Sequence, residues 1–142
     1  MIPRKSNVLV TVRDLDGQVI GISSGKNLIV TTGLDYVRDF LGGGELRADT
    51  MAVGTGTTDP VLADVALETQ VFSRTIDRRV DEAAKITFQI LLDFGDANGN
   101  VISEVGLFQN AILIARALLT PTVSKVFGKQ LTIAHEISIS NG

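Results

Sequence analysis

Glu104 and Arg116 are the residues of this 142-residue chain whose types and spacing most suggest chemistry, because each is charged within an apolar segment. Residues 104–108 and 111–116 are predicted strands joined by a tight turn at Gln109–Asn110, so the two side chains would face each other across a hairpin. A catalytic role for Glu104 has no companion motif. We therefore interpret Glu104 and Arg116 as a structural cross-strand ion pair and expect no catalytic residues.

A second candidate is the segment Gly54-Thr55-Gly56-Thr57-Thr58. Phosphate-binding loops use such glycines so that backbone N–H groups can surround an anion. The dinucleotide fingerprint needs a further glycine where Asp59 stands, and Pro60 follows it. Gly128-Lys129 lacks the earlier glycine and the following Ser or Thr of a P-loop. We favour a structural loop and expect no cofactor.

Asp96, Asn98 and Asn100 are spaced like the first ligands of a calcium loop. That loop also needs Gly at its sixth position and Glu at its twelfth, where this chain has Val101 and Leu107. An ordinary hairpin turn with an Asn-Gly signal is the preferred interpretation. The chain has no cysteine, which excludes disulfides and thiolate metal sites, so we expect no metal.

His135 is the only histidine, and alternation places it on the apolar face of a predicted strand over residues 129–140. It has no partner in a recognisable catalytic pattern, so a core or interface position is expected.

Three arginines, Arg74, Arg78 and Arg79, form a candidate interface for an acidic partner. Acidic residues are interleaved with them, so the preferred alternative is a solvated strand surface.

Bulk properties narrow the class of protein. The net charge is −3 and the sequence pI is about 5.0, so the basic footprint of a nucleic-acid-binding protein is absent. No apolar run approaches the ~20 residues of a membrane helix. The N-terminus has no apolar stretch of the secretory type. Hydrophobic residues make up 44% and the mean hydropathy is +0.27, which favours a homo-oligomer or symmetric array that buries part of the surface.

The elements that position these residues are mostly strands. Many short strands with frequent Gly and Asn turns predict a mainly-β chain, an antiparallel β-sandwich of the jelly-roll type with one short helix. Residues 1–142 form one domain, with the hairpin of residues 7–23 as a candidate attachment element. The expected strands cover 7–13, 18–23, 28–30, 50–53, 71–80, 85–94, 104–108, 111–120 and 129–140. Turns are expected at residues 14–17 and 25–27, a helical turn at 62–67, and Pro121 is expected to end its strand.

Thr31 to Leu41 is the expected helix. Thr31 or Thr32 is predicted to cap it through its hydroxyl. Leu34, Val37 and Leu41 fall on one face. Gly42 is predicted to take the left-handed conformation that ends it.

Three features in order resemble tailed-bacteriophage virion proteins. Met51-Ala52-Val53-Gly54-Thr55-Gly56 looks like the "A-V-G-x-G" strand and loop of tail-collar fibre N-terminal domains. Leu67-Glu68 and Arg74 are similar to the "L-x-x-E … R" stretch that follows there. Residues 104–108 and 114–116 are similar to "E-L-G-L-Y/F", a turn and "L-I-A". Compact relatives with "V-G-T-G-T-T-x-P" and "E-x-G-L-F … A-R" are a closer match. The resemblance covers about residues 50–120.

This resemblance implies a non-enzymatic virion component, assembled in the host cytoplasm, whose partners are other phage structural proteins. The chain stops at Gly142, so we expect no fibre shaft or receptor-binding tip. One hypothesis is a capsid cement or decoration protein that grips neighbouring major-capsid subunits. The alternative is a tail or baseplate adaptor that attaches a tail fibre. A third hypothesis is a small hydrolase or carbohydrate-binding module, against which the scarce aromatics and absent catalytic groupings argue.

Overall fold

The computed structural model describes the backbone of residues 2–140 and the side chains of residues 7–138. The described residues form one helix and nine strands, so the predicted mainly-β fold with one short helix is confirmed. In chain order the elements are β1 (Ile2–Arg13), β2 (Val19–Ile29), α1 (Thr31–Leu41), β3 (Thr50–Gly54), β4 (Gln70–Thr75), β5 (Arg78–Glu82), β6 (Lys85–Leu92), β7 (Asn100–Gln109), β8 (Ile112–Lys125) and β9 (Gln130–Ser140).

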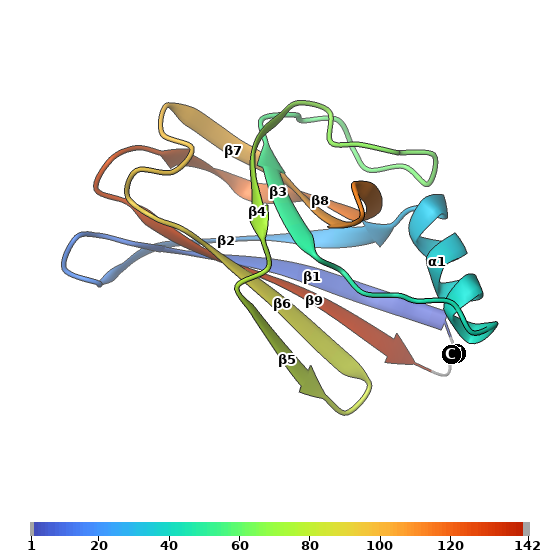
Figure 1. The fold of residues 1–142 in the computed structure, drawn as a ribbon. Coiled ribbons are helices and arrows are strands. Elements are labelled where there is room, and N and C mark those ends of the chain that lie inside the picture. The colour runs from blue at the N-terminus through green and yellow to red at the C-terminus, as the bar shows by residue number, and fades with distance from the viewer. Residues whose placement is uncertain (1, 141–142) are drawn as a thin grey trace.

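All nine strands belong to one antiparallel sheet, in the order β4-β3-β7-β8-β2-β1-β9-β6-β5 (Figure 1). A sandwich or jelly roll has two sheets, whereas here the layers arise within a single sheet that curls. Strands β4 and β5 lie at opposite edges, yet only Ile76 and Asp77 separate them in the chain. The sheet must therefore bend until the end of β4 reaches the start of β5. Arg74 of β4 holds them there by donating from Nη1 to the carbonyl of Leu91 on β6, at 2.8 Å.

The main core lies inside the curled sheet. Many of its residues come from strands in which apolar and polar side chains alternate. Every second residue of β1, β6 and β9 points inward, which is the period that a strand with one buried face requires. Strand β3, at the far side of the sheet, contributes Met51 and Val53 to the same core. The inward residues of the three alternating strands are Val8, Val10, Val12, Phe88, Ile90, Leu92, Leu131, Ile133 and His135. The side chain of Ile139, predicted for this face, lies outside the described residues.

Strand β7 and the first part of β8 are buried on both faces. A second apolar cluster covers the side away from the main core and contains Val30, Ala52, Leu67, Phe108 and Leu113. Helix α1 and the loop of residues 55–69 cover this cluster. This double burial explains why residues 102–109 are all buried, whereas a strand with one solvated face would be buried at every second residue.

Helix α1 has the predicted bounds, but its ends differ from the prediction. The residue before its first turn is Val30, and no side chain caps the helix. Thr32 instead donates its hydroxyl to the carbonyl of Leu113, at 2.6 Å. Gly42 has φ −89°, and Gly43 takes the positive φ of 102°. The predicted cap and the predicted left-handed glycine are therefore wrong. Thr32 directs its hydroxyl to β8, and the N–H of Thr31 donates instead to the carbonyl of Leu62, at 2.8 Å.

Two predicted turns are also misplaced. Residues 25–27 lie within the continuous strand β2, where Gly25 packs against the backbone of Leu118 and leaves no space for a Cβ atom. The β7–β8 turn is centred on Asn110 and Ala111, which have φ values of 49° and 65°. Positive φ at both central residues is the signature of a type I′ hairpin, whose twist suits the flanking strands.

Three further expectations fail. The predicted strand 71–80 breaks at Ile76–Asp77 because β4 pairs with β3 while β5 pairs with β6. Residues 62–67 form turns rather than a helix. Pro121 does not end β8, because residues 119–122 of β8 bulge opposite the single residue Ser103 of β7. A bulge tolerates the missing N–H group of proline.

Candidate functional site

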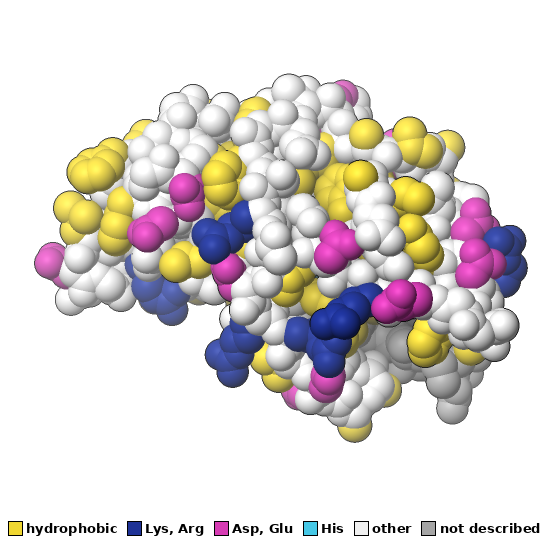
Figure 2. Space-filling model, in the orientation of Figure 1, with side chains coloured by type: hydrophobic (Ala, Val, Ile, Leu, Met, Phe, Trp, Pro, Cys, Tyr) yellow, Lys and Arg dark blue, Asp and Glu magenta, His cyan; other side chains and the backbone are white. Residues whose placement is uncertain are grey.

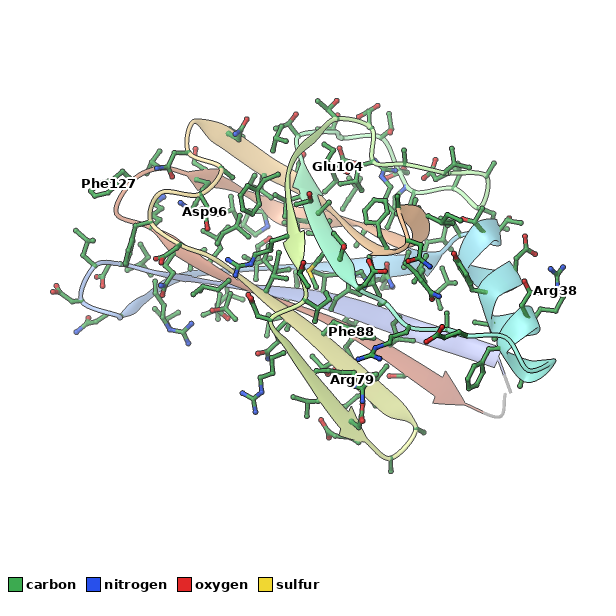
Figure 3. The ribbon with its side chains drawn as sticks, viewed as in Figure 1. Arg38, Arg79, Phe88, Asp96, Glu104 and Phe127 are labelled. Atoms are coloured by element: carbon green, nitrogen blue, oxygen red, sulfur yellow. The ribbon has the colours of Figure 1, made fainter. Side chains whose placement is uncertain are left out.

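The carboxylate of Glu104 is fully buried and is the centre of a polar cluster beside the loop of residues 55–69 (Figure 3). Its Oε2 accepts hydrogen bonds from the backbone N–H groups of Gly56 and Thr69, both at 2.8 Å. Its Oε1 accepts from the N–H of Glu68 at 2.9 Å and from Nε of Arg116 at 3.0 Å. Protein donors therefore occupy both oxygens, and neither is presented to a substrate.

Arg116 carries the cluster further into the same loop. It is 1% exposed, and its Nη1 pairs with Oδ2 of Asp64 at 3.1 Å. Its Nη2 donates to the carbonyl of Thr58 at 2.9 Å. Each guanidinium nitrogen thus has an acceptor, as a buried cation requires. The guanidinium fixes the middle of the loop, and the carboxylate of Glu104 fixes its two ends.

The structure brings the predicted pair together, but diagonally. Glu104 lies opposite Leu118 in the β7–β8 register, and Arg116 lies opposite Gly106. Residues offset by two positions in an antiparallel pair remain within reach of a long side chain. A Cβ at Gly106 would approach Leu67 and Phe108 to within 2.8 and 2.9 Å, so the space beside Arg116 is already filled.

The glycine-rich loop predicted to be structural surrounds an anion that the protein itself provides. The backbone N–H of Gly56 points at Glu104, and added Cβ atoms at Gly54 or Gly56 would collide with that carboxylate. Glu68 is a second internal acceptor, with the N–H groups of Thr57 at 2.7 Å and Thr58 at 3.3 Å. These hydrogen bonds, with that from Thr57 the largest cause, hold the pKa of Glu68 below its usual value. These contacts within the protein support the structural interpretation of the loop.

The calcium-like segment has an internal cation instead. The ammonium of Lys125, fully buried, donates to Oδ1 of Asn98 at 2.7 Å and to the carbonyl of Phe94 at 3.4 Å. Burial lowers the pKa of Lys125, while the charges of Asp96 and Asp93 oppose that shift. Among the described residues, no group of three or more His, Asp or Glu side chains is arranged to hold a metal ion.

His135 is a core residue, as predicted. It lies between Val8 of β1 and Phe88 of β6 and is fully buried. Neither ring nitrogen hydrogen bonds to a described group. Burial lowers the pKa of His135 to about 3, so the ring is neutral at physiological pH.

The three arginines of the candidate interface have different surroundings. Arg74 belongs to the closure of the sheet and also pairs with Asp77 at 2.7 Å. Arg79 is exposed and pairs with Asp81 at 3.3 Å. Arg78 is exposed and has no ion pair among the described side chains. The structure therefore leaves Arg78 and Arg79 available to a partner and removes Arg74 from that surface.

One surface feature that resembles a binding site is an uncovered apolar end of the molecule. We define the apolar end as Leu15, Val19, Ile20, Ile22 and Phe127, all of them exposed. The first four belong to the β1–β2 hairpin and Phe127 to the β8–β9 turn. The two turns lie together because Arg13 pairs with Gln130. Hydrophobic side chains gather at this left-hand end in Figure 2, away from α1.

Both turns of the apolar end are held by local hydrogen bonds. Oδ1 of Asp14 accepts the N–H groups of Asp16 and Gln18, at 2.9 and 3.0 Å, and Gly17 has φ 79°. In the second turn, the N–H of Lys129 donates to the carbonyl of Val126 at 3.2 Å. A preformed apolar surface loses little conformational entropy when a partner covers it. The sequence indicates the hairpin of residues 7–23 as a candidate attachment element but does not indicate Phe127, because one aromatic residue in a turn has no periodic signal.

Comparison of this chain with protein-family models, curated proteins and solved structures finds no match. In the described part of the chain, helical structure is too short and too polar to form a transmembrane helix.

Proposed function

We propose that this chain is a non-enzymatic structural subunit of a tailed-bacteriophage virion and that it grips neighbouring subunits through its apolar end. The leading assignment is a capsid cement or decoration protein. The observation that carries the proposal is the apolar end itself, where Phe127 is 73% exposed and Ile22 is 61% exposed. Rigid turns that display apolar side chains are typical of a surface that a partner covers.

The free energy gained by covering the apolar end is sufficient for docking. Covering the exposed part of Phe127 would remove about 150 Å² of apolar surface from water, which stabilises a complex by roughly 3–4 kcal/mol before the costs of association. Leu15 and Ile22 add comparable contributions. In a symmetric particle such contacts recur at every copy, so modest individual affinities give stable attachment.

The polar clusters support a structural role rather than an enzymatic one. A general base needs a free lone pair within reach of a substrate. Both oxygens of Glu104 are occupied, and His135 is sealed in the core. The two loops that resemble ligand-binding loops hold the side chains of Glu104 and Lys125, from strands β7 and β8, in place of ligands.

The phage-like sequence motifs have a physical counterpart in this fold. Glu104, Gly106 and Arg116 of the motif "E-x-G-L-F … A-R" form or flank the buried cluster, and the glycines of "V-G-T-G-T-T" contact it. These motifs thus describe how a loop is fixed to a sheet. Their resemblance to tail-collar fibre N-terminal domains also favours the alternative, a tail or baseplate adaptor that attaches a fibre.

Copy number in purified particles tests the proposal and separates its two forms. Quantitative mass spectrometry should find hundreds of copies per particle for a cement protein, and a dozen or fewer for an adaptor. Absence of the chain from purified virions would refute both.

Incorporation of surface variants tests the apolar end directly. The double variant Leu15→Ser/Phe127→Ser should keep its thermal stability and lose most of its incorporation into particles. Leu41→Ser is a matched control, because Leu41 is 71% exposed on α1 at the other end of the molecule. Equal incorporation of the double variant and the control would show that the apolar end is not the attachment surface.

A further inference from the structure

Strand β5 is an open edge of the sheet. It pairs with β6 on one side, and no other described strand pairs with its second side. Figure 1 shows β5 at the lower edge of the molecule, where the β5–β6 hairpin projects from the body. One row of its backbone N–H and C=O groups is therefore free to pair with another strand.

The sequence of β5, Arg78-Arg79-Val80-Asp81-Glu82, has opposite charges placed symmetrically about Val80. In an antiparallel pair of two such strands with Val80 opposite Val80, Arg79 of each copy faces Asp81 of the other. Arg78 of each copy then faces Glu82 of the other. All four cross-strand pairs join opposite charges, which is the favourable arrangement for directly opposed residues.

The side chains also lie on the correct faces for this pairing. Arg79 and Asp81 lie opposite Phe88 and Ile86 of β6, so they share the inward side of the sheet. Arg79 and Phe88 are neighbours in Figure 3. The remaining three residues of β5 share the outward side. Directly opposed residues of two antiparallel strands point to the same face, so both sets of pairs form at once.

We propose that β5 pairs with β5 of a second copy of this chain about a two-fold axis at Val80, which joins the two sheets into one. This inference rests on the sequence of β5 and its position at the edge, whatever particle the chain belongs to. It assigns Arg78 and Arg79 to a contact between copies rather than to a different acidic partner.

Other registers are disfavoured by the same charges. A shift of two residues in either direction places Arg79 opposite Arg79 or Asp81 opposite Asp81. A shift of one residue keeps only half of the opposite-charge pairs, and parallel pairing aligns like with like. The edge therefore accepts one partner register and rejects the rest, which limits uncontrolled strand addition.

The contacts that β5 makes within one chain are weak competitors. The Arg79–Asp81 pair spans 3.3 Å between side chains that are 48% and 64% exposed, and Glu82 is 3.6 Å from Lys85. Exposed pairs of this kind contribute little. Because a five-residue edge is short, we expect a dimer that forms and dissociates with concentration.

Single cysteines in this cysteine-free chain test the register. Directly opposed Cα atoms lie about 4.5–5.5 Å apart, within the range of a disulfide. Val80→Cys, on the axis, should give a disulfide-linked dimer under mild oxidation. Glu82→Cys alone should not, because its two copies would be about 13 Å apart. An equimolar mixture of Arg78→Cys and Glu82→Cys should link again. Linkage of Glu82→Cys to itself as efficient as that of Val80→Cys would overturn the register.

Charge reversal tests the association by sedimentation across a concentration series. The wild type should dimerise, while Arg78→Glu/Arg79→Glu and Asp81→Arg/Glu82→Arg should each remain monomeric and folded. Mixing the two variants should restore the dimer, because each supplies the charges that the other lacks. A wild type that stays monomeric throughout the series, or a mixture that fails to recover, would overturn the proposal.

A matched control separates the strand contact from net charge. Lys26→Glu/Lys129→Glu makes the same change in charge as Arg78→Glu/Arg79→Glu, but at positions away from β5. It should dimerise like the wild type. If it were also monomeric, overall charge rather than the β5 contact would control association.

Discussion

Replacement of Arg116 by methionine would leave the carboxylate of Glu104 buried without its cation. Methionine occupies a similar length of the site but makes none of the polar contacts of the arginine. Those contacts join the guanidinium to Glu104, to Asp64 and to the carbonyl and hydroxyl oxygens of Thr58. Three backbone N–H groups would still point at Glu104, so the site would keep donors and lose the opposite charge.

The expected cost follows from this geometry. Removal of one partner from a buried ion pair typically lowers the free energy of unfolding by about 3–5 kcal/mol. The free energy of unfolding of the whole domain is expected to be about 5–15 kcal/mol, so Arg116→Met should remove a large share of it. In a chain of this size the midpoint of thermal unfolding should fall by roughly 10 °C.

Urea unfolding measures this loss, and a double-mutant cycle identifies its origin. Glu104→Gln removes the buried charge but keeps an acceptor for the loop. Arg116→Met combined with Glu104→Gln should therefore cost about 1–3 kcal/mol less than the sum of the single variants. Amide hydrogen exchange should show Gly56 and Thr69 losing protection first.

Two outcomes would contradict the reasoning. Arg38→Met is a matched substitution at an exposed pair with Asp35 and Asp39, and it should change stability by less than about 0.5 kcal/mol. If Arg116→Met were no more costly than Arg38→Met, the buried cluster would not hold the loop. Strict additivity in the cycle would show that Glu104 and Arg116 are not coupled.

Three further predictions concern single sites. Gly106→Val should cost about 1–3 kcal/mol in a urea melt, because its side chain would overlap Leu67 and Phe108. Gly95→Val, where nothing lies within 4 Å of the added Cβ, is the control, and an equal loss in both would refute this explanation. Lys125→Met should cost about 1–3 kcal/mol and speed proteolysis within residues 93–100, because Asn98 loses its donor; unchanged cleavage there would contradict it. The folded-state pKa of His135, about 3, lies below the unfolded value. The stability that the neutral ring contributes is therefore fully present above pH 6.5 and is lost as the pH falls toward 3. Relative to His135→Leu, the wild type should therefore lose about 2–3 kcal/mol of unfolding free energy between pH 7 and pH 4.5, and parallel stability curves would refute the assignment.

The predictable parts of this fold are those in which local pattern and tertiary packing agree. Alternation identifies the inward residues of β6 and β9. The spacing of apolar residues also predicts the bounds of α1, although Leu34 and Leu41 of its expected apolar face are exposed. Residues 71–80 are predicted to be a single strand but form two short strands that pair with different partners. No local signal marks the break at Ile76–Asp77, because it results from the closure of the whole sheet.

The candidate sites show the same division. The Glu104–Arg116 pair is predictable, because charged residues at those places in an apolar hairpin need partners. The contributions of Asp64 and Glu68 are not, since they reach the cluster through a loop without regular structure. The apolar end is only half predictable, because it joins two turns that are more than 100 residues apart in the chain.

The central position of β1 has a consequence for synthesis of the chain. Strand β1 lies between β2 and β9, so the first strand to be made waits for the last before its second edge is paired. At about 5–20 residues per second, the interval from Arg13 to Ser140 is roughly 6–25 seconds. Throughout that time the valine-rich strand presents an open edge to other nascent chains. Expression that is slow or crowded on polysomes should therefore favour misassembly, and a chaperone bound to β1 would have its greatest effect before β9 emerges.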